Sequence, residues 1–257
     1  MPIVWILGPL ELGRAPGTGP VLPRRKQRVL LALLVARAGE AVSGAEIADH
    51  LWGECPPASA RANIYTYASG LRRTLRALAP GTGAGPEATR HGYRLVLPPD
   101  GSDAALFERL AAQGRACLAQ GRPGPAVREF NRALALWRGP VLHGMEQSGR
   151  IVPFAARLDE THAAALEDLA QSRMLLGQYA GLAADLVDAT ARYPLRERLW
   201  GHLMTTLYRT GRRAEALSAF VRLSALLDRE LGVRPGPEIS RLHHLIRAGR
   251  LSDTATT

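Results

Sequence analysis

The chain has 257 residues, of which 46% are hydrophobic and 22% are charged, enough for one large or two modest hydrophobic cores. No stretch approaches the ~18 consecutive apolar residues of a membrane span, and the N-terminus lacks the pattern of a signal peptide, so we expect a cytoplasmic protein. The two cysteines, Cys55 and Cys117, have neither disulfide nor metal-ligand spacing. We therefore expect no disulfide, metal or cofactor.

The formal net charge of +10 favours a polyanionic partner. Lys26 is the only lysine among 33 basic residues, and an excess of arginine is typical of GC-rich genomes, so the count alone means little. The distribution is more informative, because residues 1–98 hold twelve basic and six acidic residues. A nucleic-acid-binding module is therefore expected in this part of the chain.

The first elements alternate short strands and helices. Residues 3–10 are rich in β-branched side chains and end in Gly-Pro, which predicts a strand, with a second strand at residues 21–22. Residues 24–37 have apolar side chains at helical spacing. Ser43 and Glu46 form a capping-box pattern that predicts a short helix to about Trp52.

A longer helix is predicted over residues 58–78, after the break at Pro56 and Pro57. One stripe of this helix is apolar and predicted to be buried, namely Ala60, Ile64, Tyr67, Leu71, Leu75 and Leu78. The other side is polar and cationic, with Arg61, Tyr65, Ser69, Arg72, Arg73 and Arg76. A flexible turn at residues 81–86 and a strand at residues 89–97, with Arg90 and Arg94 near the hairpin tip, complete the order typical of a winged helix-turn-helix.

The rest of the chain is predicted to be helical. Gly177 and Gly211 lie 34 residues apart, the tetratricopeptide period, and Gly121 begins a looser third copy. Stacked helical hairpins of this kind usually form a protein-binding surface. We expect a mainly α fold with a small β component, divided into a DNA-binding domain (1–98), an all-α tetratricopeptide-like domain (102–248) and a disordered tail (249–257).

With these motifs in order, the chain resembles the Streptomyces antibiotic regulatory protein family over nearly everything from Ile6 to Ile246. In the first domain the resemblance lies in the segments LGPLE (7–11), KQRVLLALL (26–34), LWG (51–53), PPASAR (56–61) and GYRL (92–95). In the second domain it lies in ALALWRGP (133–140), PLRERLW (194–200), LYRTGR (207–212) and ELGVRPGPE (230–238).

The resemblance implies a winged helix of the response-regulator type followed by a bacterial transcriptional activator domain. Such proteins activate gene clusters for antibiotics and other secondary metabolites. The implied site is a direct repeat near the −35 promoter element, bound by a head-to-tail dimer. The implied partner is RNA polymerase holoenzyme, through region 4 of its sigma factor, with the C-terminal domain of the alpha subunit as an alternative. Such a protein would be cytoplasmic and associated with the nucleoid.

By this resemblance the third helix enters the major groove and the hairpin touches the neighbouring minor groove or backbone. The expected DNA-binding residues are Arg61, Tyr65, Thr66, Ser69, Arg72, Arg73, Arg76, Arg90 and Arg94. We assign Arg72, Arg73 and Arg94 chiefly to phosphates, because arginine clamps phosphates well, and Thr66 and Arg61 to bases. Relatives commonly carry arginine at position 70, so Gly70 removes one potential contact and costs roughly 1 kcal/mol in a helix.

Other interpretations are open at this stage. The basic face of the third helix could be solvated surface, and the winged helix could be a docking module in a protein-interaction adaptor. A ligand-sensing variant has no support, since the larger relatives that bind nucleotides use an added domain. Enzyme signatures such as Gly-x-Ser-x-Gly and His-Glu-x-x-His are absent from the sequence, which favours a non-enzyme. The four tryptophans are interpreted as core residues.

Overall fold

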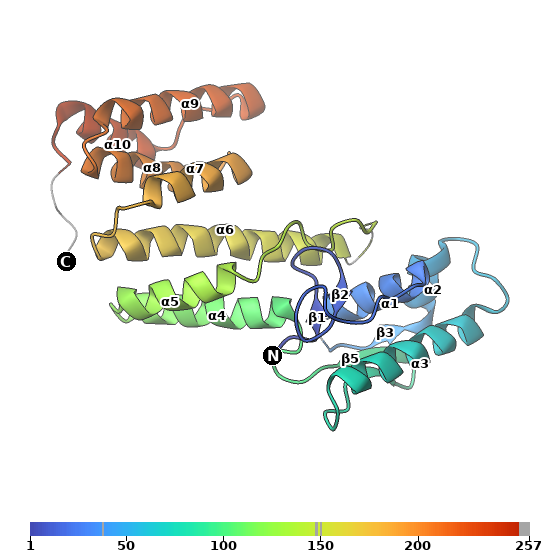
Figure 1. Cartoon of the computed structure of the whole chain (residues 1–257). Helices are drawn as coiled ribbons and strands as arrows, with labels where there is room; N and C mark the ends of the chain where they lie inside the picture. Colours follow the sequence, from blue (N-terminus) through green and yellow to red (C-terminus); the bar gives the residue numbers. More distant parts are fainter. Residues whose placement is uncertain (38, 147–148, 150, 252–257) are drawn as a thin grey trace. The chain divides into compact units, whose positions relative to one another are not determined.

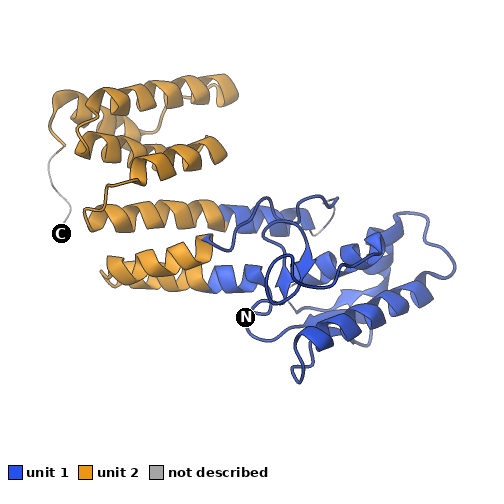
Figure 2. Ribbon diagram, viewed as in Figure 1, with its two compact units in different colours: residues 1–109, 135–160 blue, residues 110–134, 161–257 orange. Residues whose placement is uncertain are grey.

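The computed structural model describes residues 1–37, 39–146, 149 and 151–251. In these residues the fold is mainly helical with short strands, as predicted. The chain divides into two compact units, Met1–Arg109 with Ala135–Glu160 and Leu110–Leu134 with Thr161–Thr257 (Figure 2). Helices α4 (Asp103–Ala119) and α6 (Ile151–Leu175) contribute residues to both units. Within the described part of the chain, no helix is long and apolar enough to cross a membrane.

The first unit contains a helix-turn-helix with a β-hairpin wing (Figure 1). Its helices are α1 (Arg25–Ala36), α2 (Gly44–Trp52) and α3 (Ala60–Leu78). Its three-stranded sheet has the order β3-β5-β4, with β3 at Val42–Ser43, β4 at Gly85–Ala88 and β5 at Gly92–Val96. The wing is the β4–β5 hairpin, residues 85–96. Side chains from each of the three helices are fully buried, including Leu30, Leu34, Ile47, Leu71 and Leu75.

Local sequence signals predicted the helices of this unit well. Helix α1 lies within the predicted range, and the Ser43 hydroxyl accepts a hydrogen bond from the Glu46 backbone N–H at 3.0 Å. The Glu46 carboxylate pairs with Arg37 at 2.9 Å. Helix α3 begins at Ala60 rather than residue 58, since the Ala60 N–H first closes a turn onto the carbonyl of Pro57.

Two predictions about strands were wrong. No strand occurs at residues 21–22, where Val21 is 84% exposed; β1 (Val4–Trp5) pairs instead with β2 (Glu11–Leu12). The segment predicted as a flexible turn includes the start of β4, which pairs with β5 from Gly85 opposite Val96. Glycine and proline weaken the local strand signal there, and the pairing partner supplies the stabilisation that the local sequence lacks.

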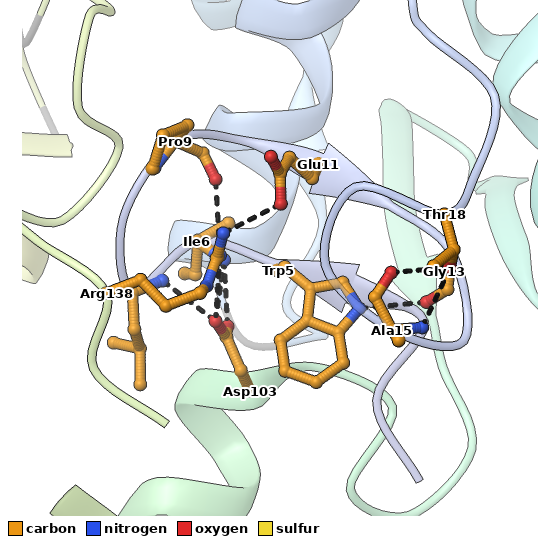
Figure 3. Close-up of polar contacts among 10 residues, drawn as sticks. Trp5, Ile6, Pro9, Glu11, Gly13, Ala15, Thr18, Asp103 and Arg138 are labelled. Atoms are coloured by element: carbon orange, nitrogen blue, oxygen red, sulfur yellow. Dashed lines mark hydrogen bonds and ion pairs between the residues drawn. The ribbon is translucent and has the colours of Figure 1, made fainter. Parts of the chain in front are cut away.

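The N-terminal segment is held by one buried carboxylate (Figure 3). Asp103 is the first residue of α4 and its side chain is fully buried. The backbone N–H of Ile6 donates to both of its carboxylate oxygens and the N–H of Leu7 to Oδ2, each at 2.9 Å. The segment also bonds to the chain just before Asp103, since the Ile3 N–H donates to the Gly101 carbonyl at 2.9 Å. Asp103 thus fastens the N-terminal segment to the start of α4.

Arg138 holds the same segment from another side. Its backbone N–H donates to the Leu7 carbonyl at 2.7 Å, while its guanidinium pairs with Glu11 at 2.7 Å and lies 3.6 Å from Asp103 (Figure 3). Trp5 completes the arrangement, because Arg138 lies over its ring and its indole N–H donates to the Gly13 carbonyl at 2.8 Å. The segment is therefore bonded by residues from two distant parts of the sequence.

The predicted burial of the tryptophans is confirmed for two of the four. Trp5 and Trp200 are each 8% exposed. Trp52 is half-buried with the Lys26 ammonium 4.4 Å above its ring, and Trp137 is half-buried with an edge-to-face contact to Phe107.

The second unit consists of helical hairpins. Besides the ends of α4 and α6 it contains α5 (Pro123–Leu134), α7 (Leu182–Arg192), α8 (Glu197–Arg209), α9 (Arg213–Leu231) and α10 (Pro237–Ala248). Helix α8 packs against α7, α9 and α10. Of the predicted tail, residues 249–251 are described: Gly249 ends α10 and Leu251 packs against the core. The rest of that prediction lies outside the described residues.

The three glycines of the predicted repeat occupy equivalent turns. Gly121, Gly177 and Gly211 follow α4, α6 and α8, each with a positive φ between 67° and 78°. At each turn the glycine N–H bonds three residues back and the next N–H bonds five residues back, which is the Schellman pattern. The apolar residues five positions later, Ala126, Leu182 and Ala216, are all buried.

Helix α1 packs against α3 at Gly70, a glycine within α3. A Cβ placed on Gly70 would lie 2.7 Å from the amide nitrogen of Gln27, a residue only 8% exposed. This nitrogen points toward the carbonyl of Tyr67 at 3.5 Å. The missing side chain at position 70 therefore leaves room for a buried glutamine of α1.

The raised pKa of Asp103 makes the stability of the folded chain depend on pH. Burial raises the pKa to about 6, against the lowering effects of the Leu7 and Ile6 N–H groups and of Arg138. The folded chain thus holds this proton at higher pH than the unfolded chain, whose reference value is 3.8. The stability contributed by the group is present below pH 4 and is lost as pH rises to about 6, on the order of 3 kcal/mol.

We therefore expect the stability of the wild type relative to Asp103→Asn to fall by about 3 kcal/mol between pH 4 and pH 7. Urea unfolding of both proteins at several pH values measures this difference, and titrations shared by the two proteins cancel. A difference that stays constant or grows with pH would contradict the raised pKa.

The packing of Gly70 against Gln27 can be tested with a double-mutant cycle. In a Gln27→Ala background, Gly70→Ala should stabilise the protein by about 1 kcal/mol, because alanine is the better helix former and the space is open. In the wild-type background the gain should be smaller, since Gln27 must move. Urea unfolding of the four proteins gives the coupling, and equal gains in both backgrounds would show that the two residues do not interact.

Candidate nucleic-acid interface

Helix α3 has one buried stripe and one exposed face. The stripe consists of Ile64, Ala68, Leu71 and Leu75, which are at most 5% exposed. The predicted stripe was partly wrong, because Ala60, Tyr67 and Leu78 are only half-buried at its edges and Ala68 replaces Tyr67 at its centre. With about 3.6 residues per turn, Thr66 and Arg73 lie on the opposite side, and both are exposed.

Four of the predicted DNA-binding arginines are exposed and have no hydrogen-bond or ion-pair partner among the described residues. Arg61, Arg73 and Arg76 project from α3, and Arg90 lies in the turn of the wing between β4 and β5. Within the described residues, none of the four forms a hydrogen bond or an ion pair, and α3 itself contains no acidic residue. We call these four arginines the free arginines, because no described residue forms an ion pair with them.

The other two predicted arginines are engaged with the wing. Arg72 is half-buried, and its Nε–H donates to the carbonyl of Pro86 in β4 at 2.9 Å. Arg94 in β5 pairs with Glu87, its cross-strand neighbour in β4, at 2.7 Å. Both Arg94 and Glu87 are about half exposed, so a strong anion could compete for Arg94.

A cavity of about 680 Å³ separates the start of α3 from the turn of the wing. Arg61 and Tyr65 line it from the helix, and Arg90, His91 and Tyr93 line it from the hairpin. Tyr65 is 64% exposed. Sequence reasoning did not predict His91 and Tyr93 as site residues. Their position beside Arg90 in a hairpin turn is the signal that would have identified them.

The polar side chains of α3 differ in the hydrogen-bonding groups and the apolar surface that they expose. The Thr66 hydroxyl donates to the carbonyl of Ala62 at 2.9 Å, so its oxygen is exposed as an acceptor and its methyl group as an apolar contact. Ser69 is half-buried, and it lies three residues before Arg72, on the same side of α3 as that wing contact. Gly70 lies on the other flank, toward α1, so this position is turned away from the wing.

Family models match both halves of the chain. Residues 19–95 match "Transcriptional regulatory protein, C terminal", and residues 102–247 match "Bacterial transcriptional activator domain". The first range includes α3 and the free arginines, and the second includes the helical hairpins. The N-terminal segment bonded by Asp103 and Arg138 lies before both ranges.

Curated relatives match over most of the chain. The regulatory protein DnrI of Streptomyces peucetius is 37% identical over 94% of this chain and 90% of its own length. The transcriptional regulator RedD of Streptomyces coelicolor is 38% identical over 95% of this chain and 69% of its own. These names are those of transcriptional regulators, in agreement with the expectation of a non-enzyme.

The solved structure of EmbR from Mycobacterium tuberculosis, in complex with a low-affinity phosphopeptide, has a TM-score of 0.86 and 33% sequence identity. The match covers 97% of this chain and 66% of the EmbR chain. Sequence motifs, fold and relatives therefore agree, and the chain belongs to the Streptomyces antibiotic regulatory protein family of transcriptional activators.

Proposed function

We propose that this protein binds promoter DNA in a sequence-specific way, with α3 in the major groove and the wing on the neighbouring minor groove or backbone. The free arginines carry the proposal: four exposed guanidinium groups without a hydrogen-bond or ion-pair partner among the described residues face solvent from two adjacent elements. Unpaired cations on one surface are costly for the isolated protein, since like charges repel, and DNA phosphates neutralise them.

The positions of these side chains suit some of them to contacts with bases and others to contacts with phosphates. Thr66 and Arg73 lie at the centre of the exposed face of α3, where a helix in the major groove meets base edges and flanking phosphates. Thr66 offers an acceptor and a methyl group, which fit a base amino group and a thymine methyl. Arg61 and Arg90 line the cavity between helix and wing, where a backbone phosphate would also approach the N-terminus of α3.

The remaining parts of the proposal rest on family membership. They are a direct-repeat site near the −35 element, a head-to-tail dimer on that site and recruitment of RNA polymerase through sigma region 4 or the alpha C-terminal domain. Residues 1–98 would bind DNA and residues 102–248 would contact the polymerase or a second protomer. The regulated genes would form an antibiotic or other secondary-metabolite cluster, in a protein that acts at the nucleoid.

The DNA-binding proposal predicts a specific change in the salt dependence of binding. The probe is a duplex enriched by the wild-type chain from a random-sequence pool. Arg73→Ala should weaken binding on the order of fivefold near 0.15 M salt and reduce the slope of log K against log salt by about one, because one phosphate contact is lost. Fluorescence anisotropy over a range of salt concentrations measures both.

The matched control is Arg128→Ala in α5. Arg128 is also exposed and forms no hydrogen bond or ion pair with a described residue, so its substitution removes the same charge from a different surface. It should leave the slope unchanged. If no duplex is enriched, or if both substitutions have the same effect, the assignment of α3 to DNA fails and the adaptor becomes the better interpretation.

A further inference from the structure

We propose that Arg72 is a positioning residue that holds the wing against α3, rather than a phosphate contact. This inference rests on the proposed DNA-binding function and concerns how that site is assembled. It divides the adjacent arginines 72 and 73 between two tasks: Arg73 faces the ligand and Arg72 faces the protein.

The contact of Arg72 with the wing is specific in chemistry and direction. Arg72 is half-buried, whereas Arg73 is exposed. The Nε–H of Arg72 donates at 2.9 Å to the carbonyl of Pro86, a buried residue of β4. A buried carbonyl that loses its donor is destabilising, so Arg72 stabilises the first strand of the wing in one position.

The backbone of β4 approaches Arg72 closely at the neighbouring residue. Gly85 has a φ of 132°, and a Cβ at this position would lie 2.8 Å from the Cα of Arg72. Only glycine allows this approach without a shift of the backbone. The wing therefore meets α3 at Arg72 through two adjacent contacts, a hydrogen bond at Pro86 and close packing at Gly85.

The position of the wing matters because the DNA contacts made by the wing and those made by α3 must form together. In the proposed complex Arg90 would reach DNA from the wing, and Arg61 and Arg73 would reach it from α3. If the wing moves relative to α3, these groups no longer match the spacing of the phosphates, and the preorganised site loses affinity. Arg72 would thus act on DNA through the wing.

Glutamine and leucine at position 72 separate the two roles. The Gln Nε2 occupies the same place along the side chain as the Arg Nε, so Arg72→Gln keeps a donor for Pro86 without the charge. Arg72→Leu keeps the length to Cδ but has no donor. For a positioning residue, Arg72→Gln should bind within about twofold of the wild type, and Arg72→Leu should bind about three- to tenfold more weakly. Arg72→Gln should also keep the wild-type salt slope, because no phosphate contact is lost.

The result that would overturn the proposal is equal weakening by both substitutions with a slope reduced by about one, which indicates a phosphate contact. Wild-type binding by both would also overturn it. Hydrogen exchange of peptides covering residues 85–96, measured without DNA, gives an independent test: exchange should be faster in Arg72→Leu and unchanged in Arg72→Gln. This test stands even if the DNA-binding proposal fails, and equal exchange in all three proteins would contradict the positioning role.

Discussion

The arrangement of the first unit depends on the bonds between the Asp103 carboxylate and the backbone N–H groups of Ile6 and Leu7. These N–H groups lie in a buried segment, where an unpaired donor is destabilising. Arg138 adds its own backbone bond to Leu7 and a charge beside Asp103. As a result, residues 135–160 belong to the same compact unit as the winged helix, although α4 and α5 separate the two in the sequence. Two family motifs, residues 7–11 and 133–140, contact each other through this arrangement.

Sequence reasoning predicted the local features of the fold and missed the long-range ones. The Ser43 cap and the turn glycines Gly121, Gly177 and Gly211 were predictable because their chemistry acts within a few residues. The bond between Asp103 and Ile6 joins residues 97 positions apart, and no local pattern marks it. The strand β4 was missed for the same reason, since its pairing with β5 outweighs a Gly-Pro sequence that favours a turn.

The candidate site was predicted as a face, but the partners of its arginines were not. Helical spacing and the absence of acidic residues were sufficient to place Arg61, Arg73 and Arg76 on the exposed side of α3. They could not reveal that Arg72 donates to Pro86 or that Arg94 lies across from Glu87. These contacts depend on the register of the wing and on its distance from α3. Within one predicted set, the structure thus separates arginines that are available to a ligand from arginines that organise the protein.

The central claim is that the exposed face of α3 lies in a DNA groove, and directed cleavage tests it most directly. An iron chelate attached through Thr66→Cys, in a chain that also carries Cys55→Ser and Cys117→Ser, should cut an enriched duplex at a few adjacent nucleotides. The same reagent attached through Arg128→Cys provides the control. Cleavage confined to the bound site by the α3 reagent is the predicted result. Uniform cleavage, or no cleavage above that of the free reagent, would contradict the placement of α3 in DNA.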